Sequence, residues 1–230
     1  MKAEDLILVS VDDHLVEPPD MFEGHIPEKY KDQAPKVVHN ERGDDVWTFN
    51  GSVIPNVGLN AVAGRPKDEY GIEPTAFDEM RPGCYDIDER IKDMNAGGVL
   101  GSMCFPSFPG FSGRLFAAAE DKDLALAVLR AYNDWHVDEW CGKYPGRFIP
   151  MGLPVLWDAD LAAEEVRRLA KKGVHSITSP RTPPPSATRA STASTGTRCG
   201  GRSPTRGWCS RSTSAPPASW RSRHPTRRST

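Results

Sequence analysis

Residues 6–14 read Leu-Ile-Leu-Val-Ser-Val-Asp-Asp-His. The stretch is apolar almost throughout to Val11 and then turns acidic, which predicts a buried strand over 6–11 with polar side chains at its carboxyl end. Because strand side chains alternate with a period of two, Asp12 and His14 are expected to point the same way. A carboxylate and an imidazole that converge there make half of a site for a divalent metal ion. The alternative for so short a pattern is a solvated Asp-Asp turn followed by a surface histidine.

Further along, strand-like and helix-like segments alternate. Asp86 and Asp158 are expected to cap helices, with Glu89 completing a capping box at the first of them. Strands that alternate with helices predict βα units around a parallel sheet, and four such units make the amino-terminal half of a (β/α)8 barrel of the TIM type. A hairpin over 37–50 is expected as an insertion between the first strand and the first helix. The expected strands are 6–11, 99–105, 148–153 and 173–177, and the expected helices are 86–96, 121–142 and one that starts near 158.

The overall net charge of −2 hides two unlike segments. Residues 178–230 hold ten of the 29 Lys and Arg and no Asp or Glu, which leaves 19 basic against 31 acidic residues in 1–177. The only large apolar side chains after residue 177 are Trp208 and Trp220. Such a segment buries too little apolar surface to offset its chain entropy. We therefore expect a partial barrel over 1–177 and a disordered tail rich in Arg, Ser, Thr and Pro over 178–230.

The cysteine spacing and the hydropathy of the sequence indicate the cellular compartment in which the protein is expected. The five cysteines show no Cys-x-x-Cys spacing, so neither a zinc knuckle nor a redox pair is indicated. No run of 18 or more apolar residues is present, and the apolar stretch near Leu6 is too short for a signal peptide. We expect an intracellular, cytoplasmic protein with free thiols and no membrane association.

Six short motifs follow one another in a set order over residues 5–177. Together they resemble the amidohydrolase-related family (amidohydrolase family 2), in the branch that is similar to aminocarboxymuconate-semialdehyde decarboxylase. In that family the first barrel strand usually carries His-x-His, and some decarboxylase members carry an acid at the first of these positions. Here Asp12 stands at the first ligand position and His14 at the second. The motifs are residues 10–22, residues 85–94, Gly97-Gly98-Val99, Phe105-Pro106-Ser107, Tyr132-Asn133-Asp134-Trp135 and Arg147-Phe148-Ile149-Pro150.

The resemblance implies one divalent ion, Zn²⁺ in most members, with Mn²⁺ or another ion as the alternative. The family holds it with the first-strand pair, a His on strand five, a His on strand six and an Asp on strand eight. It implies hydrolysis or decarboxylation of a small carboxylate or amide-type substrate, and homo-oligomers among full-length relatives. This chain offers only Asp12 and His14, fewer than the three or four protein ligands of a tight site. We therefore expect the chain as written to be inactive and to bind zinc poorly.

Other candidate residues have ordinary alternatives. Glu17 is expected in a loop, as a carboxylate that supports the ligands rather than binds the ion. His175 and His136 are expected to be structural or to lie at the surface. Ser107 follows a strand and could contact substrate or form a turn.

The abrupt change after Ile177 suggests translation in a shifted reading frame of a GC-rich gene. Read from the third base of each codon, Trp208-Cys209 encodes Val, because the bases GTG are forced. Residues 209–218 then allow a sequence that resembles the family's fifth strand with its metal-ligating His, and residues 194–200 and 180–186 allow two more family-like stretches. The alternative is a genuine Arg-rich tail on a non-catalytic α/β protein. Ten Arg without acids suit the phosphates of a nucleic acid, although natural basic tails normally mix Lys with Arg.

Overall fold

The structure is a computed structural model that describes residues 2, 6–55, 57–58, 61–70 and 74–179. The expected tail lies outside the described residues from position 180 on, as do the positions of its shifted-frame readings. The domain boundary predicted at residue 177 falls two residues before the described part ends.

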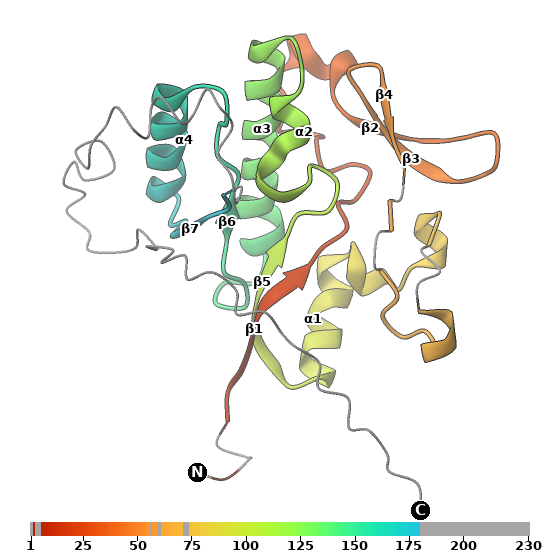
Figure 1. Ribbon diagram of the computed structural model, residues 1–230. Coiled ribbons are helices and arrows are strands. Elements are labelled where there is room, and N and C mark those ends of the chain that lie inside the picture. The colour runs from red at the N-terminus through yellow and green to blue at the C-terminus, as the bar shows by residue number, and fades with distance from the viewer. Residues whose placement is uncertain (1, 3–5, 56, 59–60, 71–73, 180–230) are drawn as a thin grey trace, which may run out of the picture. The chain divides into compact units, whose positions relative to one another are not determined.

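Parallel strands form the centre of the fold and follow one another in chain order (Figure 1). β1 (Leu8–His14) pairs in parallel with β5 (Val99–Phe105), and β6 (Met151–Gly152) pairs in parallel with β7 (Ser176–Ile177). A single parallel bridge between Ser102 and Phe148 joins β5 to the segment before β6. Strands that neighbour each other in the order of the sequence are typical of a βα barrel. The expected α/β architecture, with four strands of a barrel, is therefore present.

β1 differs from the expectation of a buried strand. Its apolar side chains are exposed, as are those just before it: Leu6 is 64% and Ile7 73% exposed, and Leu8, Val9 and Val11 are exposed too. The prediction of burial rested on the apolar sequence of 6–11 alone, whereas burial of a barrel strand also requires a neighbour on each side. Among the described strands β1 pairs only with β5, so one edge of it is open.

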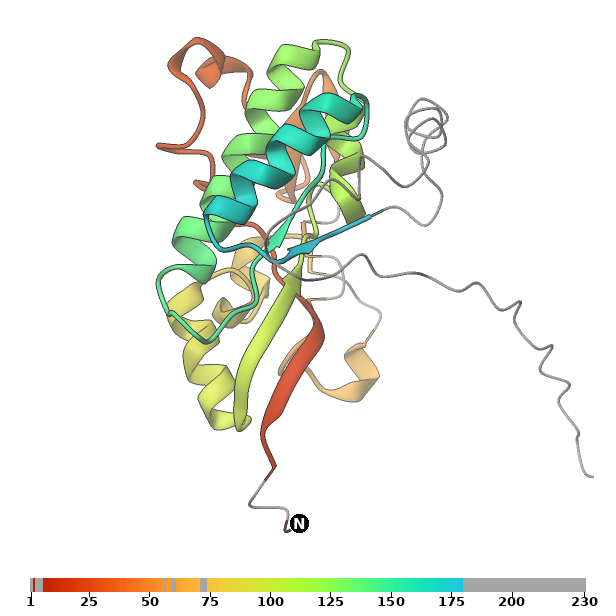
Figure 2. The ribbon, with the colours of Figure 1, turned by 90° about the vertical axis from the view of Figure 1, so that its left-hand side faces the viewer.

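Three long helices cover the strands, and each begins at an aspartate. α1 (Ile87–Ala96), α3 (Lys122–Trp135) and α4 (Ala159–Lys171) are capped by Asp86, Asp121 and Asp158, whose carboxylates accept from backbone N–H groups of the first turn. The caps at Asp86 and Asp158 confirm the sequence prediction. The N–H of Asp86 is bonded to the carbonyl of Pro82, so Glu89 is not needed to complete the box. α3 and α4 lie side by side (Figure 2).

Two other elements differ from their predicted form. The helix expected to run to residue 142 changes at His136 into a π-helical turn, η7 (His136–Cys141). The expected strand 148–153 shortens to the two residues of β6, because Pro150 has no N–H to donate to a ladder. β7 is equally short, although 173–177 was expected to be extended throughout.

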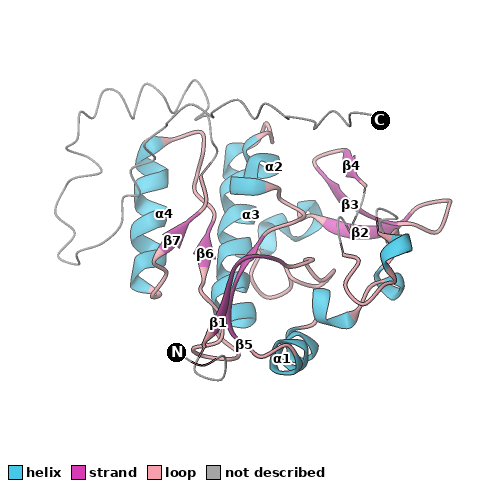
Figure 3. Cartoon of the chain, turned by 60° about the horizontal axis from the view of Figure 1, so that its bottom comes forward, coloured by secondary structure: helices cyan, strands magenta, loops and turns pink. Residues whose placement is uncertain are grey.

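The expected hairpin is present and gains a third strand. β2 (Lys36–His39), β3 (Asp45–Phe49) and β4 (Ser52–Ile54) form an antiparallel sheet of their own, apart from the parallel strands (Figure 3). Trp47 of β3 stacks on Phe108, with ring centroids 4.2 Å apart, so the hairpin packs against the segment that follows β5. The remaining helical segments are α2 (Arg114–Ala117) and the 3-10 turns η2 (Glu28–Gln33), η3 (Lys67–Glu69), η4 (Phe77–Glu79), η5 (Pro82–Cys84) and η6 (Phe111–Gly113).

Most of the core lies between the helices and these loops rather than along β1. Its largest fully buried apolar and aromatic side chains are Trp47, Tyr132, Phe116, Leu15, Met21, Leu129, Leu153 and Leu169. In the described part of the chain, no helix is both long and apolar enough to cross a bilayer.

Candidate functional site

The carboxyl end of β1 contains a β-bulge. Residues 10–13 of β1 lie opposite residues 102–104 of β5, so three steps along one strand face two along the other. In a β-bulge two residues of one strand lie opposite a single residue of its partner, and beyond the bulge the side chains alternate between the two faces as usual. Asp13 consequently falls on the face of Ser102 and Cys104. Asp12 and His14, on either side of Asp13, fall on the opposite face, and both are exposed.

Asp13 is held on the helix side of the strand by two partners. Its Oδ2 accepts a hydrogen bond from the Ser102 hydroxyl at 2.7 Å and one from Arg90 Nη1 at 3.0 Å. Arg90, from α1, also donates through Nη2 to the backbone carbonyl of His14 at 2.6 Å. Sequence reasoning gave Asp13 and Arg90 no role. The signal that could have found them is the Asp12-Asp13 doublet, since only one of two adjacent strand carboxylates can face the exposed side.

The imidazole of His14 packs beside two aromatic rings that also contact each other. Its centroid is 5.8 Å from that of Phe105 and 6.0 Å from that of Phe111, and the two phenyl rings are 5.7 Å apart. Phe111 belongs to a loop in which Gly110, Ser112 and Gly113 all have positive φ. The two rings contact the imidazole on one side, while the His14 side chain as a whole stays exposed.

The side chains at this end of β1 offer atom types that bind divalent ions, but too few of them for a complete site. Carboxylate oxygen and imidazole nitrogen are common ligands of zinc and manganese. The described residues contain no group of three or more His, Cys, Asp or Glu side chains that could hold a metal. Asp12 and His14 therefore form at most a partial ligand set within 6–55, 57–58, 61–70 and 74–179.

Glu17 lies in a loop, as expected, and its side chain is fully buried. Its carboxylate accepts hydrogen bonds from the backbone N–H groups of Ser107 and Phe108 at 3.0 and 2.7 Å and from the Tyr132 hydroxyl at 3.1 Å. Burial raises the pKa of Glu17 to about 7, and the hydrogen bonds, led by that from Phe108, oppose the rise. Glu17 thus joins the loops after β1 and β5 to α3, which is a structural role.

The motif Tyr132-Asn133-Asp134-Trp135 also fixes the fold. Asn133 bonds both backbone groups of Leu153, donating to its carbonyl at 3.0 Å and accepting from its N–H at 2.8 Å, and it donates to buried Glu165 at 2.9 Å. Asp134 accepts from Arg168 and Lys172 of the α4 segment. Together these contacts join α3 to α4 and to the segment after β6.

The other candidate residues lie away from Asp12 and His14. His136 is buried and stacks on Tyr132, and burial lowers its pKa to about 4. His175 is exposed just before β7. The hydroxyl of Ser107 donates to the carbonyl of Leu15 at 2.6 Å, and the carbonyl of Ser107 accepts from the N–H of Gly110 in a turn.

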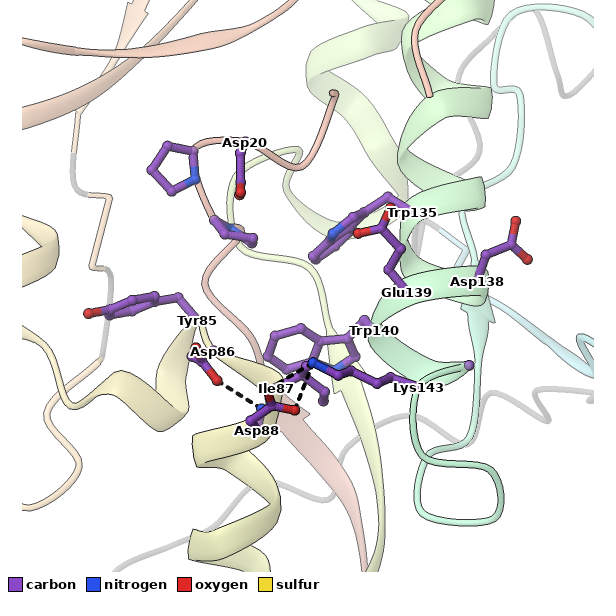
Figure 4. A pocket seen from close by; sticks show the side chains of 13 residues that line it. Asp20, Tyr85, Asp86, Ile87, Asp88, Trp135, Asp138, Glu139, Trp140 and Lys143 are labelled. Atoms are coloured by element: carbon purple, nitrogen blue, oxygen red, sulfur yellow. Dashed lines mark hydrogen bonds and ion pairs between the residues drawn. The ribbon is translucent and has the colours of Figure 1, made fainter. Parts of the chain in front are cut away.

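A surface cavity of about 820 Å³ lies elsewhere. It is formed between the first turn of α1 and η7, with Trp135 and Trp140 on one side and carboxylates around it (Figure 4). Asp88 there is paired with Lys143 at 2.8 Å. Neither Asp12 nor His14 lines it. A site at the end of β1 would instead be an open surface, because the described strands do not close around it.

Residues 22–191 match the profile of the family described as amidohydrolase. The chain belongs to the amidohydrolase family. The matched region begins after His14, so the family assignment does not depend on Asp12 and His14. No curated protein matches the chain.

One solved structure is similar in fold. An amidohydrolase from Mycobacterium avium subsp. paratuberculosis superposes with a TM-score of 0.53 at 19% identity. The match covers 75% of the present chain and 49% of the Mycobacterium chain. A 2,6-dihydroxybenzoate decarboxylase from Rhizobium gives a TM-score of 0.40 at 19% identity, over 74% and 37% of the two chains. The chain thus spans about half the length of the first structure. The fold is α/β and corresponds to the amino-terminal half of a (β/α)8 barrel.

Proposed function

We propose that the chain is part of a metal-dependent amidohydrolase-type enzyme, a hydrolase or a carboxy-lyase that acts on a small carboxylate or amide-type substrate. Asp12 and His14 supply two ligands of one divalent ion, Zn²⁺ or, as the alternative, Mn²⁺ or another ion. The observation that carries the proposal is the bulge of β1, which turns both side chains to one exposed face at the carboxyl end of the strand. In βα barrels this end is where the loops that build active sites meet.

The residues present suit this role chemically. When bound at such a site, a divalent ion supplies Lewis acidity, either by lowering the pKa of a bound water to about 7 or by holding a substrate carboxylate during loss of CO2. Asp12 in place of a histidine adds negative charge to the ligand set, which slightly favours decarboxylation or an ion other than zinc. Phe105 and Phe111 contact the His14 ring on one side.

The chain as written is inactive on this proposal, because two ligands are too few for tight binding and the remaining ones belong to later barrel strands. The complete protein is cytoplasmic and homo-oligomeric. A shift of the reading frame after residue 177 is part of this proposal.

A zinc titration followed by NMR of the histidine rings tests the proposal. We expect the His14 resonances to shift with a weak, saturable affinity. The shift is lost in His14→Gln and reduced in Asp12→Asn, whereas His175→Gln, which removes another exposed histidine, leaves it unchanged. Absence of any zinc response at His14 would contradict the assignment of the ligands, and stoichiometric submicromolar binding would contradict the claim that the set is incomplete.

A further inference from the structure

The Asp12-Asp13 doublet poses a problem that the structure resolves. The two carboxylates are chemically equivalent, and a slip of one residue in the pairing of β1 would exchange the faces of all its side chains. Asp13 would then be exposed, while Asp12 and His14 would turn toward the helices. β1 has only one partner strand among those described, so backbone pairing alone gives limited protection against such a slip.

The geometry points to Arg90 as the positioning residue of the Asp12/His14 pair, acting through the Asp13 carboxylate and the His14 carbonyl. This inference rests on the proposed function, since it assigns the residue that orients the proposed ligands. Arg90 touches neither ligand side chain in this role; it holds the Asp13 carboxylate and the His14 carbonyl, and with them the strand segment that carries both proposed ligands.

Two features make Arg90 suited to this task. The planar guanidinium donates from separate nitrogens to two points one residue apart, Asp13 Oδ2 at 3.0 Å and the His14 carbonyl at 2.6 Å. An ammonium group on a flexible stem has no such fixed fork. Arg90 thereby fixes the strand on both sides of the Asp13–His14 peptide bond.

Burial makes the contact stronger than a surface ion pair. The Arg90 side chain is 13% exposed, and its guanidinium lies 5.8 Å from the ring centroid of Trp140. Ser102, fully buried on β5, donates to the same Oδ2 at 2.7 Å and so binds the Asp13 carboxylate from the neighbouring strand. A slip that brought His14 opposite Cys104 would take the carboxylate away from both donors, and a buried guanidinium without its partner is costly.

Arg147 offers a matched control. It too is an arginine that holds a strand through backbone carbonyls, donating to Leu100 at 2.7 Å and to Val99 at 3.1 Å. These carbonyls lie at the amino end of β5, far along the strand from Phe105, which is paired with His14. Loss of Arg147 should therefore destabilise the fold without reorienting Asp12 and His14.

The experiment compares Arg90→Gln, Arg90→Lys and Arg147→Gln by the same zinc titration and, without metal, by NOEs from the His14 ring to Phe105 and Phe111. We expect Arg90→Gln to weaken zinc binding at His14 at least about tenfold, as loss of groups that orient metal ligands typically does, and to lose the NOEs. Arg90→Lys should recover little of either, and Arg147→Gln should keep both while its unfolding temperature falls.

The outcomes separate this inference from the proposed function. If the parent chain shows no zinc response at His14, the proposed function fails, whatever the variants do. If the parent responds and Arg90→Gln keeps its affinity and its NOEs, the positioning role is wrong and the proposed function stands. Should Arg90→Gln not fold, Arg90→Lys decides: it keeps the positive charge and removes the fork of donors, and unchanged zinc affinity together with unchanged NOEs would overturn the inference.

Discussion

Glu17 and Glu165 are both fully buried glutamates, yet their stability effects should depend on pH in opposite directions. Burial raises the pKa of Glu17 from its usual 4.5 to about 7. Burial acts the same way on Glu165, but hydrogen bonds from Arg168 and Asn133 and the charges of Arg168 and Arg130 outweigh it, so the pKa of Glu165 is lowered. The perturbation we consider first is Glu17→Gln, with Glu165→Gln as its matched control.

The sign for Glu17 follows from proton linkage. Between pH 4.5 and 7 the folded state holds a proton on Glu17 that the unfolded state has lost, so the free energy of unfolding falls as pH rises. At about 1.4 kcal/mol per pH unit, the contribution that is present below pH 4.5 and lost through pH 7 is about 3 kcal/mol. Glu17→Gln has no such group, so its stability relative to the parent should increase by that amount over the interval.

Glu165 should behave oppositely. Because its folded pKa lies below the unfolded value, its contribution is present above the unfolded pKa of about 4.5 and is lost on acidification. Glu165→Gln should therefore be most destabilised, relative to the parent, near neutral pH. Urea unfolding of the three proteins at half-unit steps from pH 3 to 8 measures both differences, that of Glu165→Gln below pH 4.5 and that of Glu17→Gln above it. A flat difference between Glu17→Gln and the parent over this range would refute the reasoning, since it would mean that the three hydrogen bonds keep Glu17 ionised despite its burial.

Three further predictions concern the fold. Asn133→Leu should cost about 3 kcal/mol in urea unfolding, because it leaves both backbone groups of Leu153 and one bond of Glu165 unpaired; an effect below the error of the measurement would contradict this role. Ser112→Gly should stabilise by about 1 kcal/mol, seen as a higher unfolding temperature, because Ser112 has φ +66 and a buried hydroxyl without a hydrogen-bond partner in the described part; a lower temperature would argue against strain there. Val11→Lys should slow aggregation in light scattering without lowering the unfolding temperature, because Val11 is exposed on the open strand β1. The same change at Val166, an exposed position on helix α4, should have little effect on aggregation, and equal effects at both positions would contradict the role of the open strand.

The sequence was informative where structure is set locally. The aspartates that cap α1 and α4 and the hairpin of β2 and β3 depend on residues a few positions apart, and all were predicted. The burial of β1 was predicted wrongly, because it depends on neighbouring strands that the described part lacks. The π-helical turn at His136 has no local signal comparable to a proline or a glycine.

The candidate site shows the same division. Alternation along a strand was enough to suggest Asp12 and His14 as partners. The residue that holds their strand, Arg90, lies 77 positions from Asp13, and the contact becomes visible only once α1 is packed on β1 and β5. Glu17 was expected near the ligands, yet its partner Tyr132 is 115 positions away and draws it into the core.

The most direct test of the central claim is the metal content of the protein encoded by the resequenced gene, expressed through codon 178 in its continuous frame. The account predicts an inserted or deleted base near that codon and a corrected frame that continues to the remaining ligands. It also predicts one divalent ion per chain, which is lost in His14→Gln and in Asp12→Asn. An intact frame that truly encodes the Arg-rich tail, or a bound metal that both variants retain, would contradict it.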